Sequence, residues 1–271
     1  MTARLITLTT DFGTRDPYVA AVKGVLASRV PGATTIDLSH DLPPFDAAEA
    51  GYFLLGAIAY FPPKTVHLVV VDPGVGGPRR GIAVASGDQF LVGPDNGVFG
   101  YTLAERGWSE AVRLDGGTYA RRPISPTFHG RDLFAPAAAV LAGGGLVAAL
   151  GPTIADPIVT PIPPTLREGG VIIGTVWHID RFGNCITNIR AGQLPEGIGD
   201  AFRVVAAGQQ IPSFVRTYAS APAGAPVALL SSGGFLEIAT TEGRADERLG
   251  LAPGTPVRLE PVIEGALDDT R

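Results

Sequence analysis

A carboxylate and a guanidinium occur seven positions apart in residues 69–80, VVVDPGVGGPRR. The β-branched run predicts a buried strand that ends at Asp72, and Pro73 blocks further ladder pairing. The glycines that follow allow tight backbone angles and place no bulky side chain over the carboxylate. Asp72 could therefore contact a small ligand, and Arg79 could fold back and hold that carboxylate ionised. A tight turn carrying a surface ion pair would show the same pattern.

Two further polar residues follow strand-like runs. Asp11 comes just after the strand predicted at residues 5–9, and in open α/β sheets ligands bind beyond the carboxyl ends of the strands. A carboxylate at that place can accept two hydrogen bonds from a ribose diol. It could instead cap the following helix, although Asp16 suits that role better. Asn96 lies in the turn sequence GPDNG and could reach a ligand, whereas Asp95 fits a plain turn.

A histidine lies in residues 127–132, TFHGRD, just before a late helix. An isolated histidine is most often structural. The glycine and polar neighbours of His129 fit equally well a group that handles protons in a site.

Residues 180–184, DRFGN, form another polar segment in the second half of the chain. Phe182 could stack on a purine, and Asn184 could bond the edge of adenine. A polar hairpin is the alternative interpretation of this segment.

Composition excludes several classes of protein. The chain has 271 residues, of which 45% are hydrophobic and 17% charged, with a formal net charge of −5 and no run of Lys or Arg. This composition fits a compact globular protein and argues against a nucleic-acid partner. Cys185 is the only cysteine, and the four histidines are scattered, so we expect no disulfide, no metal site and no cofactor. No apolar run approaches the roughly 20 residues that span a bilayer, and no signal peptide precedes the first strand, so we expect a soluble cytoplasmic protein.

The order of the predicted elements gives the fold class. Strand and helix patterns alternate through the first 150 residues, which predicts an N-terminal three-layer α/β domain, 1–155, with a largely parallel sheet. Its predicted helices are residues 16–30, 46–60 and 136–150. A proline-rich linker, 156–170, follows. Short strand patterns then predict a C-terminal antiparallel β-barrel domain, 171–271.

Six segments in order resemble the S-adenosylmethionine hydrolases, also called S-adenosylmethionine hydroxide adenosyltransferases, which are relatives of fluorinase and chlorinase. They are TTDFGTRDPYVAAVKG, VDPGVGGPRR, VGPDNGVFG, TFHGRD, IDRFGN with ITNI, and SSGGFLEIA. The resemblance implies an N-terminal α/β domain and a C-terminal β-barrel domain. It also implies a homotrimer in which each site lies between the N-domain of one subunit and the C-domain of its neighbour.

Residue roles follow from the same resemblance. It implies a catalytic triad of Asp72, Arg79 and His129. The implied substrate-binding residues are Asp11 at the ribose, Phe45 where the halogenases carry a tryptophan, Phe182 and Asn184 at adenine, Asp180 and Ser232 near the methionine end, and also Asn96, Phe128 and Glu237.

Three positions distinguish this chain from the halogenases. Asp72 and Val75 replace a tyrosine and a threonine, so we expect no halide pocket, and Gly233 stands where the halogenases place an arginine. The implied reaction is S-adenosyl-L-methionine plus water giving adenosine and L-methionine. The alternatives are a chloride-using 5′-halogenase of the same superfamily and a non-catalytic sensor of S-adenosylmethionine or adenosine.

Overall fold

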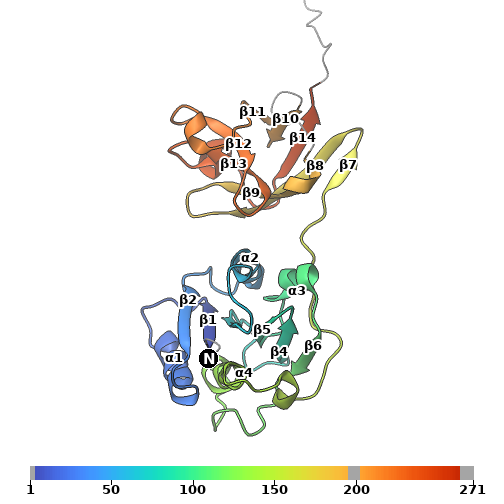
Figure 1. Ribbon diagram of the computed structural model, residues 1–271. Helices are drawn as coiled ribbons and strands as arrows, with labels where there is room; N and C mark the ends of the chain where they lie inside the picture. The colour runs from blue at the N-terminus through green and yellow to red at the C-terminus, as the bar shows by residue number, and fades with distance from the viewer. Residues whose placement is uncertain (1–3, 195–201, 263–271) are drawn as a thin grey trace, which may run out of the picture. The chain divides into compact units, whose positions relative to one another are not determined.

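The computed structural model describes residues 4–194 and 202–262 (Figure 1). The chain divides into two compact units, residues 1–161 and 162–271. Each unit has its own sheet and its own hydrophobic core.

The first unit is built on a six-stranded sheet with the order β2-β1-β3-β5-β4-β6. The strands are β1 (Leu5–Thr10), β2 (Thr34–Ser39), β3 (Val66–Val70), β4 (Gly81–Ser86), β5 (Gln89–Pro94) and β6 (Glu110–Arg113). The four strands β2, β1, β3 and β5 run parallel, whereas β4 and β6 pair antiparallel. The sheet is therefore mixed, and β2, β1, β3 and β5 form its parallel part.

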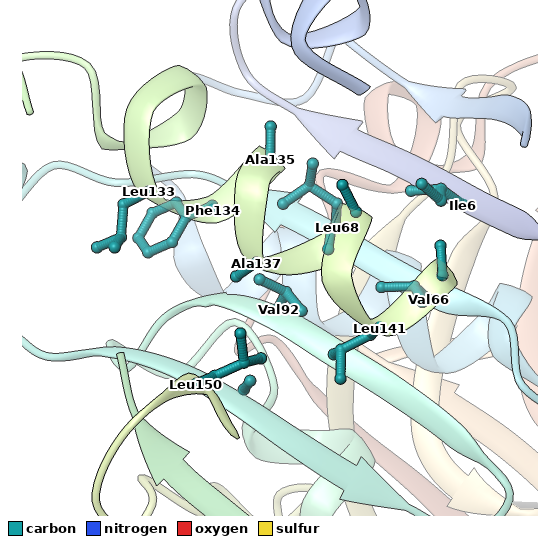
Figure 2. Close-up of a cluster of buried hydrophobic side chains, with 14 of the residues drawn as sticks. Ile6, Val66, Leu68, Val92, Leu133, Phe134, Ala135, Ala137, Leu141 and Leu150 are labelled. Carbon is teal, nitrogen blue, oxygen red and sulfur yellow. The ribbon is translucent and has the colours of Figure 1, made fainter. Parts of the chain in front are cut away.

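Helices cover both faces of this sheet, and the alternation along β3 shows how. Leu68 and Val70 pack in one core cluster with α1 (Tyr18–Arg29) and α4 (Ala135–Ala142). Val69 and Val71 pack in the opposite cluster with α2 (Ala47–Ile58) and α3 (Gly100–Arg106). Figure 2 shows Ala137 and Leu141 of α4 on the same side of the sheet as Ile6 and Leu68. Successive side chains of a strand point to opposite faces, so a strand buried on both faces reads as a continuous apolar run.

Two predicted helix boundaries are wrong. The predicted helix at residues 136–150 ends at Ala142, because three glycines follow and Gly144 takes a φ of 92°. A separate 3₁₀ turn, η2 (Val147–Leu150), completes the segment, and a π-helical turn, η1 (Gly130–Phe134), precedes α4. The first helix begins at Tyr18 after Pro17, and Asp16 does not cap it.

The cap of α2 follows from its sequence. The Asp46 side chain accepts a hydrogen bond of 2.9 Å from the Glu49 amide, which satisfies one of the free N–H groups of the first turn.

The second unit is an antiparallel, nearly closed barrel-like sheet with the path β11-β10-β14-β8-β9-β13-β12, on which β7 pairs with β8. Its strands are β7 (Leu166–Glu168), β8 (Val171–Ile179), β9 (Cys185–Arg190), β10 (Phe202–Ala206), β11 (Gln209–Ile211), β12 (Pro226–Leu230), β13 (Phe235–Thr240) and β14 (Pro256–Pro261). Its helical segments are η3 (Ala191–Gln193), η4 (Tyr218–Ser220) and α5 (Ala245–Leu249). The predicted fold class is confirmed: an α/β unit followed by an antiparallel β unit. Among the described residues, no helix has the length and apolarity to span a membrane.

One buried histidine couples the stability of the first unit to pH. His67 lies on β3 with no exposed surface, its Nδ1 is 2.8 Å from Thr7 Oγ1, and its ring meets the Phe61 ring edge-on. Burial, assisted by the positive charge of Arg106, lowers the pKa of His67 from 6.5 to about 4. The folded protein therefore holds this ring neutral at a pH where the unfolded chain protonates it.

We predict that the free energy of unfolding falls as the pH decreases from 6.5 towards 4, because the unfolded state binds the additional proton. The loss attributable to His67 should reach about 3 kcal/mol at the acid end. His67→Gln, which keeps a polar side chain but does not titrate, should show a shallower fall in urea unfolding measured from neutral pH to pH 4. If the free energy of unfolding falls equally with pH in the two proteins, His67 does not cause the loss of stability.

Candidate functional site

Three neighbouring parallel strands bring polar residues to one edge of the first sheet. Thr10 of β1 pairs with Val70 of β3, and Leu68 of β3 pairs with Val92 of β5. The carboxyl ends of these strands therefore lie side by side, and Asp11, Asp72 and Asn96 follow those ends. This is the edge at which open α/β sheets bind ligands.

Arg79 lies between Asp72 and His129. Its Nε donates to Asp72 Oδ1 at 2.8 Å, and its Nη2 donates to Asp72 Oδ2, which makes the pair bidentate. The same Nη2 is 2.8 Å from His129 Nδ1. The side chains of Asp72 and Arg79 are only 5% and 11% exposed, so their interaction is only weakly screened by water.

The contact with Arg79 decides where His129 carries its proton. A guanidinium only donates hydrogen bonds, so Nδ1 of His129 accepts, and the neutral ring bears its hydrogen on Nε2. Burial lowers the pKa of His129, and the Arg79 charge lowers it further, against the opposing effects of Asp72 and Asp132. His129 is therefore a neutral ring with an N–H donor at Nε2.

Glycine is required in the turn between Asp72 and Arg79. Gly76 has a φ of 77°, and a Cβ atom there would lie 2.4 Å from the carbonyl oxygen of Pro126. The turn thus packs directly against the backbone just before His129. A Cβ at Gly74 would lie 3.1 Å from Cγ of Arg79, so this position also leaves room for the folded-back arginine.

A cavity of about 590 Å³ opens at this edge of the sheet. Its lining includes Asp11, Phe45, Asp72, Phe128 and His129 among the predicted residues. Sequence reasoning missed several other lining residues: Phe12, Tyr18, Ser125, Thr127 and Arg131. The rings of Phe12, Tyr18 and Phe128 meet edge-on in a cluster, with centroids 5.3 to 5.9 Å apart. The aromatic residues in the first and fourth family segments were the available signal for this wall.

Asp11 holds a strained residue at the cavity. Its Oδ2 accepts a hydrogen bond of 2.9 Å from the Phe45 amide. Phe45 has a φ of 71°, which is unusual for a bulky residue, and its side chain is 72% exposed. The bond therefore fixes an aromatic side chain at the rim, in a backbone conformation that such residues rarely adopt.

Asn96 does not line this cavity. Its Nδ2 donates to the carbonyl of Val71 at 2.9 Å, directly before Asp72. The structure thus places Asn96 behind the loop that carries Asp72, in a position to support it. Asp95, the expected plain-turn residue, is buried and accepts hydrogen bonds from Arg80 and from the Ile158 amide.

The remaining predicted residues lie in the second unit, around Asp180. Asp180 Oδ1 accepts hydrogen bonds from the amides of Phe182 and Asn184, at 2.8 and 2.9 Å, and its Oδ2 accepts from Asn184 Nδ2 at 3.0 Å. Phe182 is 73% exposed, whereas Asn184 is buried. Gly183 has a φ of 82°, and a Cβ there would lie 2.5 Å from Asp246 Oδ1. The loop therefore presents one aromatic ring on a rigid frame.

A second cavity, of about 660 Å³, is lined by Asp180, Phe182 and Asn184 together with Tyr218. Tyr218, which lies in no recognisable motif, donates a hydrogen bond from its hydroxyl to Glu237 Oε1 at 2.6 Å. Burial raises the pKa of Glu237, and the nearby Asp180 charge raises it further, although the Tyr218 bond opposes this. Glu237 thus lies behind Tyr218, and Ser232 is exposed on the turn between β12 and β13, outside the residues that line this cavity.

Metal ligands do not gather in the described part of the chain. Within residues 4–194 and 202–262, no three His, Cys, Asp or Glu side chains lie close enough together to hold a metal ion.

Comparison with known proteins identifies a family whose two domain models match the two halves of the chain. The model of the SAM hydroxide adenosyltransferase N-terminal domain matches residues 6–151, and that of its C-terminal domain matches residues 174–258. The chain belongs to the SAM hydroxide adenosyltransferase family. The expected family resemblance is confirmed.

Individual relatives extend the match over most of this family member. It is 45% identical over 258 residues to the (R)-S-adenosyl-L-methionine hydrolase of Thermus thermophilus, covering 92% of this chain and 96% of the relative. A fluorinase from Actinoplanes is 29% identical over 269 residues, covering 87% and 90%. The crystal structure of an uncharacterized conserved protein from Thermotoga maritima superposes with a TM-score of 0.87 at 32% identity, covering 94% of this chain and 99% of that one.

Proposed function

We propose that this protein is a cytoplasmic hydrolase that cleaves S-adenosyl-L-methionine by attack of water at C5′, giving adenosine and L-methionine. The observation that carries the proposal is the Asp72–Arg79–His129 cluster, of which Asp72 and His129 line the same cavity as Asp11. The relatives named (R)-S-adenosyl-L-methionine hydrolase, at 37–45% identity, support this substrate, while the fluorinases are more distant.

The chemistry balances with water as the only co-reactant. The water oxygen forms a bond to C5′ as the C5′–S bond breaks, and the bonding electrons leave with sulfur as the neutral thioether of methionine. Asp72 accepts the proton that the water loses. Arg79 holds both oxygens of this carboxylate in one orientation, so Asp72 accepts the proton as the C–O bond forms. Because the positive charge of the sulfonium disappears in this step, a cavity that excludes bulk water favours it.

His129 orients the water in this mechanism. Its Nδ1 is occupied by the hydrogen bond from Arg79, so the ring offers Nε2–H as a donor and not a lone pair as a base. The lowered pKa keeps the ring neutral at neutral pH, which avoids placing a second positive charge beside the sulfonium substrate. Positioning of the water in line with C5′ and sulfur could contribute several kcal/mol.

Substrate recognition uses both clusters. In the first cavity, Asp11 accepts hydrogen bonds from the ribose hydroxyls. Phe45 and Phe128 supply apolar surface there. In the second, Phe182 stacks on adenine. Asn184 uses one N–H for Asp180, so its Oδ1 and its second N–H remain to bond the amino group and a ring nitrogen of adenine. Asp180 fixes that amide, and Ser232 contacts the methionine end.

The proposed assembly is a homotrimer in which the first cluster of one subunit and the second cluster of a neighbour together bind one substrate. The support is the family membership and the distribution of the implied residues over two separately folded units. Asn96 contributes to substrate binding indirectly, because it supports the loop that carries Asp72. Glu237 contributes indirectly as well, because it accepts the hydrogen bond that holds Tyr218.

The reaction is tested in water enriched in heavy oxygen. Purified protein with S-adenosyl-L-methionine should form adenosine that carries the heavy oxygen on C5′, and activity should persist in EDTA. Heavy oxygen in a methionine-derived product alongside methylthioadenosine would place the attack on a different carbon. Dominant 5′-chloroadenosine in chloride would identify a halogenase, no product at all would identify a sensor, and restoration of an EDTA-sensitive activity by zinc or magnesium would refute the metal-free mechanism.

We predict that Asp72→Asn lowers kcat for adenosine release by at least about a hundredfold, because the amide keeps the shape but cannot accept the proton. The Kd for adenosine, measured by calorimetry, should stay within about tenfold. The control is Asp88→Asn, which removes an exposed carboxylate 3.7 Å from Arg106 and should leave kcat unchanged. Near-normal turnover by Asp72→Asn would remove this residue from the mechanism.

Shared sites predict complementation between two inactive variants. Asp72→Asn damages the first cluster and Asn184→Ala the second, so mixed oligomers of the two should contain some sites with both halves intact. Activity should rise above that of either parent after dissociation and reassembly. If mass spectrometry detects mixed trimers but activity stays at the parental level, the site is not shared.

A further inference from the structure

A groove separate from the substrate cavity carries an excess of positive charge. It has a volume of about 500 Å³ and lies between one face of α1, from Ala21 to Arg29, and the side chains of Arg121 and Arg131. Gly24 contributes no side chain, and even a Cβ atom there would meet nothing within 4 Å, so the groove is open along the helix.

A single carboxylate balances the arginines of this groove. Asp132 is fully buried, and its Oδ1 accepts from Arg131 Nε at 2.8 Å and Arg121 Nη1 at 3.2 Å. Its Oδ2 accepts from Arg131 Nη2 at 2.7 Å and from the Ser125 amide at 2.9 Å. Asp132 therefore has both oxygens fully engaged and has no further capacity to neutralise a third guanidinium.

Arg29 is that third guanidinium. Its Nη1 donates to the carbonyl oxygen of Tyr119 at 2.7 Å, and no carboxylate among the described residues pairs with it. Three guanidinium groups thus face one carboxylate, which leaves two formal positive charges in the groove. Each of the three arginines also has N–H donors beyond those used in these bonds.

We infer that this groove binds an anion of the phosphate class, such as pyrophosphate or a triphosphate group. Planar guanidinium groups pair with phosphate oxygens in a bidentate manner, which makes arginine the favoured residue for this class of ligand. The groove lining contains no aromatic residue on which a nucleobase could stack, so the phosphate groups are the recognised part.

Arg131 connects this groove to the substrate cavity. It lines both, and its guanidinium carbon is 4.9 Å from the centre of the Phe128 ring, next to His129 in the chain. An anion that engages Arg131 therefore contacts a side chain that also lines the cavity. The inference does not depend on the proposed reaction, because binding is measured without turnover.

Binding is tested by calorimetry at low ionic strength with sodium pyrophosphate, and with ATP in a second series. We expect saturable binding of one pyrophosphate per chain, with ATP bound about as well because only its phosphates are recognised. Arg29→Gln should weaken pyrophosphate binding by about tenfold or more, since it removes a charged hydrogen-bond donor. Arg106→Gln, which removes one positive charge elsewhere in the same unit, should leave the affinity unchanged.

A second variant tests the binding without replacing Arg29, in case Arg29→Gln affects folding. Ser28 is exposed on α1 at the groove, so Ser28→Glu places a carboxylate there without disturbing the core, and it should abolish the binding. Absence of saturable binding by the native protein, or equal affinity in native protein, Arg29→Gln and Ser28→Glu, would overturn the inference. Equal weakening in Arg106→Gln would also overturn it, because that result indicates a general effect of net charge.

Discussion

The ion pair between Arg79 and Asp72 is the interaction on which the rest of the first cluster depends. Both groups are nearly buried, so either one alone would be an uncompensated charge with little access to water. Their bidentate contact offsets that desolvation and fixes the carboxylate in one orientation. The same guanidinium donates to His129, and this contact sets the tautomer of the ring. A single side chain thus fixes the orientation of the carboxylate and the proton position of the imidazole.

The surrounding fold holds Arg79 in place from several directions. β3 is buried on both faces, and Asn96 binds the carbonyl that precedes Asp72, so the carboxylate cannot shift along the sheet edge. Gly76 lets the connecting turn pack against the backbone before His129. Phe134 also contacts Arg79, with its ring centre 5.2 Å from the guanidinium carbon. Phe134 ends the π-helical turn that follows His129, so that irregular turn is part of the site geometry.

Strand ends were predictable from sequence, whereas side-chain partners between distant segments were not. The apolar runs at β1 and β3 predicted both strands. Parallel pairing of these strands places Asp11 and Asp72 at one edge of the sheet. Local pattern could not show that Asn96 supports a backbone carbonyl, because this depends on the β3–β5 register. Tyr218 had no local signal either, since its role comes from a buried carboxylate nineteen residues away. The end of α4 was missed because alanine-rich periodicity outweighed the glycines that terminate it.

Charge also separates the two concave surfaces of the first unit. Around the cavity at the strand ends, Arg79 balances Asp72 and Asp132 balances Arg131, which leaves the negative charge of Asp11. That residual charge suits a sulfonium cation, and it opposes the approach of a free halide. Around the groove of α1, the same Arg131–Asp132 pair leaves the two positive charges of Arg29 and Arg121. The buried Asp132–Arg131 salt bridge therefore lies between a cavity whose remaining charge is negative and a groove whose remaining charge is positive.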